Sequence, residues 1–218
     1  MRYLKVISLA CLLFFSFQLT GISDTGNDTI VFRWALYVKD KAINAGEKDT
    51  ETIIKIGEEN QVKPGQRIKF LFQPLTQTYI YLFLYTSKRE MLLLFPGDFT
   101  LFENKRYFND YYLFPPDREW RPLPGGSGRE EFFLIASNKR HKDLEDLVLR
   151  TGKEDKMAPE AGSSLYEKLI ILLQQHSSPD VSSEKFITIA GQLKDEGKDL
   201  ITEVTSRSFY IKRFELFY

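Results

Sequence analysis

Apolar and polar side chains alternate along much of the chain before residue 138, a pattern typical of strands rather than helices. The clearest case is IVFRWALYVK at 30–39, where Arg33, Tyr37 and Lys39 share one face of an extended chain. The other face carries only large apolar side chains, namely Ile30, Phe32, Trp34, Leu36 and Val38. Alternation at period two with one apolar face predicts a half-buried strand over residues 30–39.

Short apolar runs bounded by turn residues predict further strands. They are TIIKIG at 52–57, QRIKFLFQP at 66–74, YIYLFLY at 79–85, MLLLF at 91–95 and EFFLIAS at 131–137. The charged stretch at 40–52 suits an exposed loop or a hairpin connection. The run at 79–85 carries large side chains on both faces, so we expect a central strand between packed layers.

Residues 99–120 are dense in aromatic rings. Eight of them fall in this stretch: Phe99, Phe102, Tyr107, Phe108, Tyr111, Tyr112, Phe114 and Trp120. Two arrangements fit such a composition, because the rings either pack as edge strands against the sheet or face a ligand. Under the second arrangement, the candidate surface for a ligand or partner is Tyr107, Tyr111, Tyr112 and Trp120.

The hydrophobic period changes after residue 141. A first predicted helix at 142–150 has Leu144, Leu147 and Val148 at helical spacing. Ser164 and Glu167 have the spacing of a capping box ahead of a second, leucine-rich helix. A third helical pattern, diluted by two glycines, consists of Phe186, Ile189, Ala190 and Leu193. The closing segment SRSFYIKRFELFY at 206–218 predicts a strand with aromatic rings on both faces.

These elements predict a mainly β (α+β) fold, an antiparallel β-sandwich-like domain with a helical insertion of two to three helices. Residues 24–218 suit one domain, because a chain of about this length can bury roughly 70% of its unfolded surface. We expect its core at 62–148, the helical insertion at 141–200 and the closing strand at 206–218.

The first residues have the composition of a targeting segment. Arg2 and Lys5 precede a mostly apolar run at 6–19, and small and polar residues follow it. This order predicts a secretory signal peptide at 1–23, and the run is shorter than the roughly 20 apolar residues that span a bilayer. The protein is therefore expected to be exported to the periplasm or the extracellular space, with an uncleaved membrane tether as the alternative. Cleavage would follow Gly21 or Ser23.

Cys11 is the only cysteine of the chain, and it lies inside the apolar run. Removal of the signal peptide would leave a mature chain without any thiol. Structural disulfides, a thiol nucleophile and cysteine-ligated zinc are then all excluded.

Charge and motifs give little support to catalysis or to nucleic-acid binding. The 30 basic and 30 acidic residues balance, so electrostatic capture of nucleic acid or anionic lipid is not indicated. The two histidines, His141 and His176, occupy different segments, and each is expected as an exposed turn or helix-end residue. Residues 125–129, GGSGR, lack the last glycine of a nucleophile elbow. We therefore expect a protein that is not an enzyme and has no catalytic residues, cofactor or metal.

One further possibility is a hard-cation site formed by Asp98, Glu103 and Asn104. Oxygen ligands of this kind suit calcium. Their spacing lacks the regular ligand pattern of calcium loops, so this site is a weak alternative.

Several sequence features are shared with one bacterial family. They are VKPGQRIKF at 62–70, the aromatic strand at 79–85, MLLLFPGD at 91–98, LFPP at 113–116 and GGSGREEFFLIAS at 125–137. Through them residues 62–148 resemble the DUF4384 family of domains of unknown function, with Gly97 at the place of a usual asparagine. The resemblance implies a compact, mainly β module with a helical insertion, and it implies no catalytic residue.

The expected function follows from the predicted export of the protein and from the lack of a recognisable catalytic motif. We expect an exported bacterial accessory domain that binds an envelope or extracellular protein through strand edges or through the 99–120 segment. The alternative is a glycan-binding module in which Trp120, Tyr111 and Tyr112 stack on sugar rings. An enzyme ranks third, because its groups would have to be gathered from distant positions.

Overall fold

The computed structural model describes residues 28–40, 50–54, 61–123, 128–150, 159–176, 182–190 and 198–218. The elements in chain order are β1 (Ile30–Asp40), β2 (Thr50–Ile54), β3 (Arg67–Pro74), β4 (Tyr79–Tyr85), β5 (Met91–Phe95), the 3₁₀ helix η1 (Phe99–Glu103), β6 (Tyr112–Phe114), β7 (Arg121–Pro122), β8 (Arg129–Ser137), α1 (Lys142–Arg150), α2 (Pro159–His176), β9 (Ser182–Ala190), β10 (Lys198–Ser206) and β11 (Phe209–Phe217). The signal peptide expected at 1–23 lies outside the described residues and stays a prediction.

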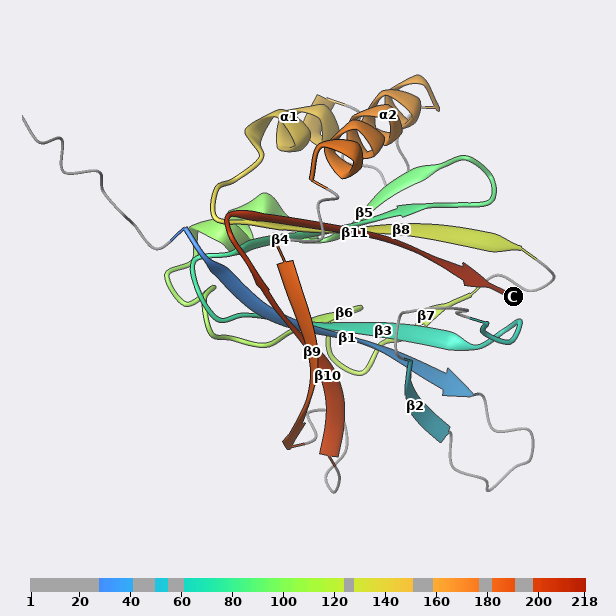
Figure 1. The fold of residues 1–218 in the computed structure, drawn as a ribbon. Helices are drawn as coiled ribbons and strands as arrows, with labels where there is room; N and C mark the ends of the chain where they lie inside the picture. Colours follow the sequence, from blue (N-terminus) through green and yellow to red (C-terminus); the bar gives the residue numbers. More distant parts are fainter. Residues whose placement is uncertain are drawn as a thin grey trace, which may run out of the picture.

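The strands form two sheets that face each other (Figure 1). The first sheet has seven strands in the order β6-β3-β1-β10-β9, with β2 also paired to β1 and β7 to β3. The second sheet has four strands in the order β11-β8-β4-β5. All pairings between these strands are antiparallel. The predicted mainly β, sandwich-like fold is confirmed.

Aromatic rings fill the space between the two sheets. Trp34 of β1 stacks on Phe214 of β11 with ring centroids 5.6 Å apart, and Phe214 stacks on Phe132 of β8 at 5.1 Å. Phe70 of β3 reaches Phe132 across the interface at 5.5 Å. Each such pair contributes about 0.5–1.5 kcal/mol beyond the area that it buries. These contacts therefore bind the two sheets into one core.

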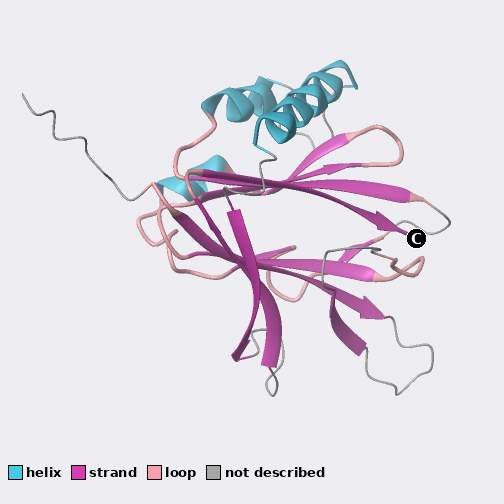
Figure 2. Cartoon of the chain, in the orientation of Figure 1, coloured by secondary structure: helices cyan, strands magenta, loops and turns pink. Residues whose placement is uncertain are grey.

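The outer face of the second sheet is covered by the helical elements, as Figure 2 shows. Tyr81 of β4 lies 5.2 Å from Phe102 of η1, and Tyr85 lies 4.4 Å from Tyr166 of α2. The opposite face of β4 is buried in the interface between the sheets. The prediction that residues 79–85 form a central strand between packed layers is confirmed.

The first sheet differs from expectation on its outer face. The strand expected to be half buried, β1, also buries Ala35 and Tyr37 there, in a small cluster with Leu71 and Ile201. Neighbouring strands supply this second set of apolar side chains, and a single-strand pattern does not contain them. Trp120 packs against the same cluster.

The helix boundaries correct one prediction. The capping box predicted at Ser164 and Glu167 is wrong, because α2 already begins at Pro159 and both residues lie within it. Proline is favoured in the first turn of a helix, since its fixed φ suits the helix and it lacks an N–H that would go unpaired. None of the described helices has both the length and the apolar character needed to cross a bilayer.

The third predicted helix is also wrong. Residues 182–190 form β9, which pairs along its whole length with β10. Phe186, Ile187 and Thr188 are types that favour strands, and they gain a complete ladder from β10. The insertion expected at 141–200 therefore contains two helices and then returns to strand in β9 and β10. The closing strand expected at 206–218 is β11, apart from Ser206 at the end of β10.

Glu130 of β8 is a buried carboxyl group. Glu130 is only 3% exposed, and its Oε2 has no hydrogen-bond partner among the residues that the structure describes. Burial raises the pKa of this carboxyl above its ordinary value of 4.5, and the positive charge of Arg121 opposes the rise. Glu130 therefore weakens the fold when it is ionised.

Substitution of Glu130 by glutamine should stabilise the protein by about 1 kcal/mol at neutral pH, because a neutral amide avoids the burial of a charge. An acid whose pKa is raised on folding contributes stability below its unfolded pKa and loses it as the pH rises through the folded value. The advantage of Glu130→Gln should therefore vanish below about pH 4. Urea unfolding at both pH values measures it, with the exposed Glu119→Gln as control. A variant less stable than the wild type at neutral pH would contradict the assignment.

Candidate functional site

The aromatic segment packs against the sheets, which confirms the first of its two expected arrangements. β6 pairs with β3, and Phe99 and Phe102 of η1 are buried. Tyr107 is fully buried, and its hydroxyl oxygen accepts a hydrogen bond from the Ile80 N–H at 3.2 Å. Burial raises the pKa of Tyr107 well above its ordinary value. Tyr107 was wrongly placed among the candidate surface residues, because no ligand can reach its ring.

The other candidate rings differ in their exposure. Tyr112 is half buried and its hydroxyl donates to the Tyr107 carbonyl at 3.1 Å, whereas Tyr111 is 40% exposed. Burial, with the charge of Asp110, raises the pKa of Tyr112 to about 12. The four residues therefore do not form one exposed aromatic face.

Trp120 is half buried and is engaged by two cations. The ammonium groups of Lys39 and Lys69 lie 5.3 and 5.2 Å from its ring centroid. Lys69 is itself buried and donates to the Asp117 carbonyl at 2.5 Å. Cation–π contacts of this kind use the ring face on which a sugar would stack.

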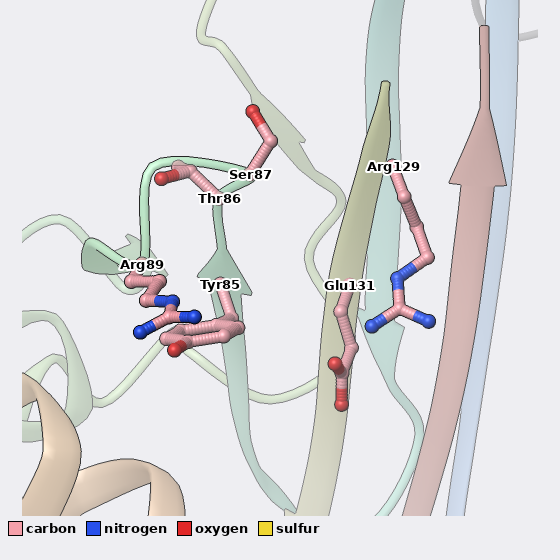
Figure 3. Close-up of a pocket in the computed structure, with 6 residues that line it drawn as sticks. All are labelled: Tyr85, Thr86, Ser87, Arg89, Arg129 and Glu131. Carbon is pink, nitrogen blue, oxygen red and sulfur yellow. The ribbon is translucent and has the colours of Figure 1, made fainter.

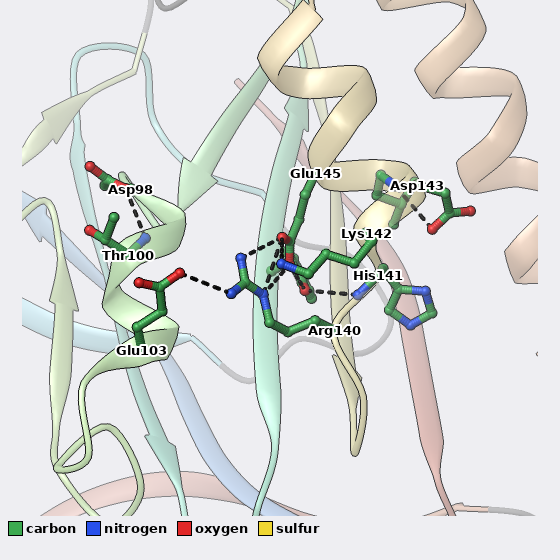
Figure 4. A network of polar contacts seen from close by, with 10 residues as sticks. Asp98, Thr100, Glu103, Arg140, His141, Lys142, Asp143 and Glu145 are labelled. Atoms are coloured by element: carbon green, nitrogen blue, oxygen red, sulfur yellow. Dashed lines mark hydrogen bonds and ion pairs between the residues drawn. The ribbon is translucent and has the colours of Figure 1, made fainter.

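A polar network beneath α1 connects several charged groups (Figure 4). Glu145 of α1 accepts hydrogen bonds from the Tyr81 hydroxyl at 2.8 Å and from Arg140 Nη2 at 2.5 Å. The Tyr81 oxygen accepts in turn from the His141 N–H at 3.1 Å. Arg140 also pairs with Glu103 of η1 at 3.5 Å. The network thus joins β4, η1 and α1.

The electrostatics of this network indicate a structural role. Burial would raise the pKa of Glu145, but the hydrogen bonds from Arg140 and Tyr81 outweigh it and hold the pKa below its ordinary value. Burial raises the pKa of Tyr81 far above its ordinary range. An ionised carboxylate with three donors and a neutral phenol hold α1 on the sheet, and neither is poised to transfer a proton at neutral pH.

The residues of the suggested hard-cation site are used within the protein. Asp98 accepts from the Thr100 N–H at 2.8 Å and caps η1, while Asn104 Oδ1 accepts from the Arg106 N–H at 2.9 Å. Glu103 is paired with Arg140. Among the residues that the structure describes, no three histidine, aspartate or glutamate side chains are grouped as metal ligands.

Both histidine rings lie close to the ring of Phe209, a grouping that their sequence positions did not indicate. The rings of His141 and His176 lie 5.2 and 4.0 Å from that of Phe209. His176 is exposed at the helix end as expected, but His141 is not an exposed turn residue. Burial lowers the pKa of the His141 imidazole, which favours a neutral packing group.

β9 is an edge strand of the first sheet, and most of its described side chains are exposed (Figure 1). β9 pairs with β10 on one side, and no other described strand pairs with it. Phe186 is 50% exposed, and Ile187 on the opposite face is half buried. The helical interpretation of this segment concealed the edge, although the β-branched residues at 187–189 indicated it.

The first half of β9 is fixed to the rest of the domain by charged groups. Glu184 accepts from the Tyr210 hydroxyl and from Lys212 Nζ, both at 2.7 Å, and so spans the two sheets. Lys185 pairs with Glu203 at 2.7 Å on the other face. The pKa of Glu203 is lowered by Lys185 and by Arg33. These contacts hold the edge strand in a defined position.

Arg140→Ala should destabilise the protein by about 3 kcal/mol, because it leaves the buried Glu145 carboxylate without its main partner. A group whose pKa is lowered on folding contributes stability that is present above its unfolded pKa, here 4.5, and lost as the pH falls through the folded value. The difference between the variant and the wild type should therefore narrow in acid. Urea unfolding across this pH range measures it, and the exposed Arg118→Ala is the control. A loss no larger than that of the control would show that the network contributes little.

Comparison with known proteins identifies one family. The family model described as "Domain of unknown function (DUF4384)" matches residues 61–140, a range that contains β3 to β8. No curated protein matches the chain, and no solved structure does. The match confirms the resemblance drawn from the sequence, and β1, β2, α1, α2 and β9 to β11 lie outside it. The chain is a DUF4384 domain-containing protein.

Proposed function

We propose that this protein is an exported protein-binding module that takes an extended segment of an envelope or extracellular protein as an additional strand along β9. The observation that carries the proposal is the long edge of β9, whose nine residues pair with β10 alone among the described strands. An extended peptide can pair with such an edge through main-chain hydrogen bonds. Export is inferred from the segment at 1–23.

The other sheet edges support the choice of β9. The outer edge of β3 is already paired with β6 and β7, and β5 has only five residues. On β11, Phe217 forms a bridge with Gln61. Among the edge strands that the structure describes, β9 is therefore the longest one without a bridge on its outer side.

The side chains of β9 provide a basis for specificity. Phe186 and Ile187 point to opposite faces of the strand, so a partner strand would meet an apolar group on each face. Lys185 and Glu184 place charges next to them, and charges on edge strands oppose pairing between copies of the same chain. The β9 edge thus combines a backbone that can pair with a partner strand and charged side chains that oppose pairing between two copies of this chain.

The glycan-binding alternative stays a prediction and has less support. Tyr107 is buried, Tyr112 is half buried and the Trp120 ring is covered by two lysines. Stacking on a sugar needs an accessible ring face, which leaves Tyr111 as the most exposed ring of the candidate set.

Proline substitution at adjacent positions of β9 tests the proposal. Backbone N–H groups alternate in direction along a strand, so in Ile187→Pro and Thr188→Pro one proline removes an N–H that points to β10 and the other removes one that points outward. The variant that loses the N–H towards β10 should lose about 1 kcal/mol of stability, and the variant that loses the outward N–H should keep the wild-type melting temperature. We expect the variant that loses the outward N–H to recover none of the proteins that the wild type recovers from an envelope extract.

Ile187→Val and Thr188→Val are the matched controls, because they keep every backbone N–H. Both should recover the same proteins as the wild type. If the proline variant that keeps its melting temperature recovers the wild-type set in full, recognition along the β9 edge is ruled out.

A further inference from the structure

A pocket of about 300 Å³ lies on the second sheet, where the β4–β5 turn meets the start of β8 (Figure 3). Its volume is at the lower end of the range for small-ligand sites, which begins at about 300 Å³. It is lined by Tyr85, Thr86, Ser87, Arg89, Arg129 and Glu131. None of these residues belongs to β9, so the pocket is separate from the edge strand.

The β4–β5 turn holds Arg89 in an uncommon backbone conformation. Arg89 has a φ of 62°, in the left-handed region that glycine and asparagine adopt more readily. This conformation is unfavourable for a residue that carries a β-carbon. The turn maintains it through hydrogen bonds from the Arg89 N–H to the Thr86 carbonyl at 2.8 Å and from the Thr86 N–H to the Glu90 carbonyl at 2.9 Å. Strained backbone of this kind is concentrated at functional sites.

The negative charge in the pocket wall is neutralised from outside the pocket. Glu131 is 2% exposed and forms an ion pair with Arg213 Nε at 2.5 Å. It also accepts a hydrogen bond from the Tyr166 hydroxyl at 3.4 Å. Figure 3 shows its side chain between Tyr85 and Arg89 on one side and Arg129 on the other. Glu131 is therefore occupied by β11 and α2 and does not neutralise both arginines of the pocket.

The two lining arginines retain capacity for a ligand. Arg129 is 55% exposed and approaches Glu215 only at 3.6 Å, and Glu215 is shared with Arg213 at 3.1 Å. The Arg89 side chain is exposed, and in the described part of the chain it forms no ion pair within 4.0 Å. The pocket thus presents two guanidinium groups whose positive charge is only partly balanced by carboxylates of the protein.

We propose that this pocket binds a carboxylate, with Arg89 and Arg129 holding its oxygens and the Tyr85 ring packing against the organic part of the ligand. Guanidinium groups match the planar carboxylate and can hold it through two parallel hydrogen bonds. The Thr86 hydroxyl accepts from the Glu90 N–H at 3.2 Å and keeps its own proton to donate. The charge of Glu131 is balanced by Arg213, so the preference for an organic carboxylate over inorganic phosphate comes from the Tyr85 ring, which offers packing surface that phosphate does not use.

The same chemistry has two sources, a small organic acid and the chain end of a peptide. Titrations followed by amide and arginine-side-chain NMR signals distinguish them. The probes are benzoate against benzamide, N-acetyl-glycyl-phenylalanine against its C-terminal amide, and inorganic phosphate. We expect shifts at Ser87, Arg89 and Arg129 with at least one of the carboxylates and none with the matched amide.

Three variants locate the binding. Arg89→Asn removes the guanidinium and suits the left-handed backbone, so the turn should keep its fold. Arg129→Gln removes the second cation from an exposed position. Each should weaken carboxylate binding about tenfold or more, since a hydrogen bond to a charged group contributes about 1.5–3 kcal/mol. Lys88→Gln removes an exposed cation of the same turn that does not line the pocket, and should leave the affinity unchanged.

Binding of benzoate alone would identify a small-acid site, and binding of the peptide acid alone would identify a chain-end site. Four results would overturn the proposal. They are no binding by either acid, equal binding by the amides, tighter binding by phosphate, and a loss in Lys88→Gln as large as in the arginine variants.

Discussion

The burial of β4 on both faces is the constraint on which the other elements depend. One face packs between the two sheets, so the tyrosines and phenylalanines on the other need a separate cover. η1, α1 and α2 supply it with Phe102, Glu145 and Tyr166. Tyr81 is both a core ring and the donor to Glu145, so the position of α1 follows from that of the central strand. A buried hydrogen bond such as that between Tyr81 and Glu145 forms only when both groups are correctly placed, so it fixes the orientation of α1 on the sheet.

Elements whose burial follows from their own residues could be predicted from the sequence. The two-faced pattern at 79–85 indicated a central strand, and the alternation at 30–39 indicated the inner face of β1. β9 could not be assigned in this way, because Phe186, Ile189 and Ala190 fit a helical period and the same segment also contains strand-forming residues. The ladder with β10 and the contacts of Glu184 with Tyr210 and Lys212 are non-local, so no local pattern contains them.

Candidate site residues were harder to predict for the same reason. The composition of 99–120 indicated that its rings are important but not which of them are buried, and Tyr107 is buried only because β4 and η1 meet around it. The pocket residues Arg89 and Arg129 belong to segments that become adjacent through the antiparallel pairing of β4 with β8, which ends at Tyr85 and Glu131. This pairing register is a property of the sheet, so the spacing of the arginines in the sequence carried no signal.

The alternation of side chains on β11 relates the two proposed recognition surfaces. Lys212 points into the sandwich and holds Glu184 of β9, whereas its neighbour Arg213 points to the outer face and holds Glu131 in the pocket wall. Successive residues of one strand thus support the edge strand of the first sheet and the charge balance of the pocket on the second. Because these side chains lie on opposite faces, Arg89 or Arg129 can be changed without loss of a contact that positions β9. The same separation leaves the pocket lining intact when a proline is placed in β9.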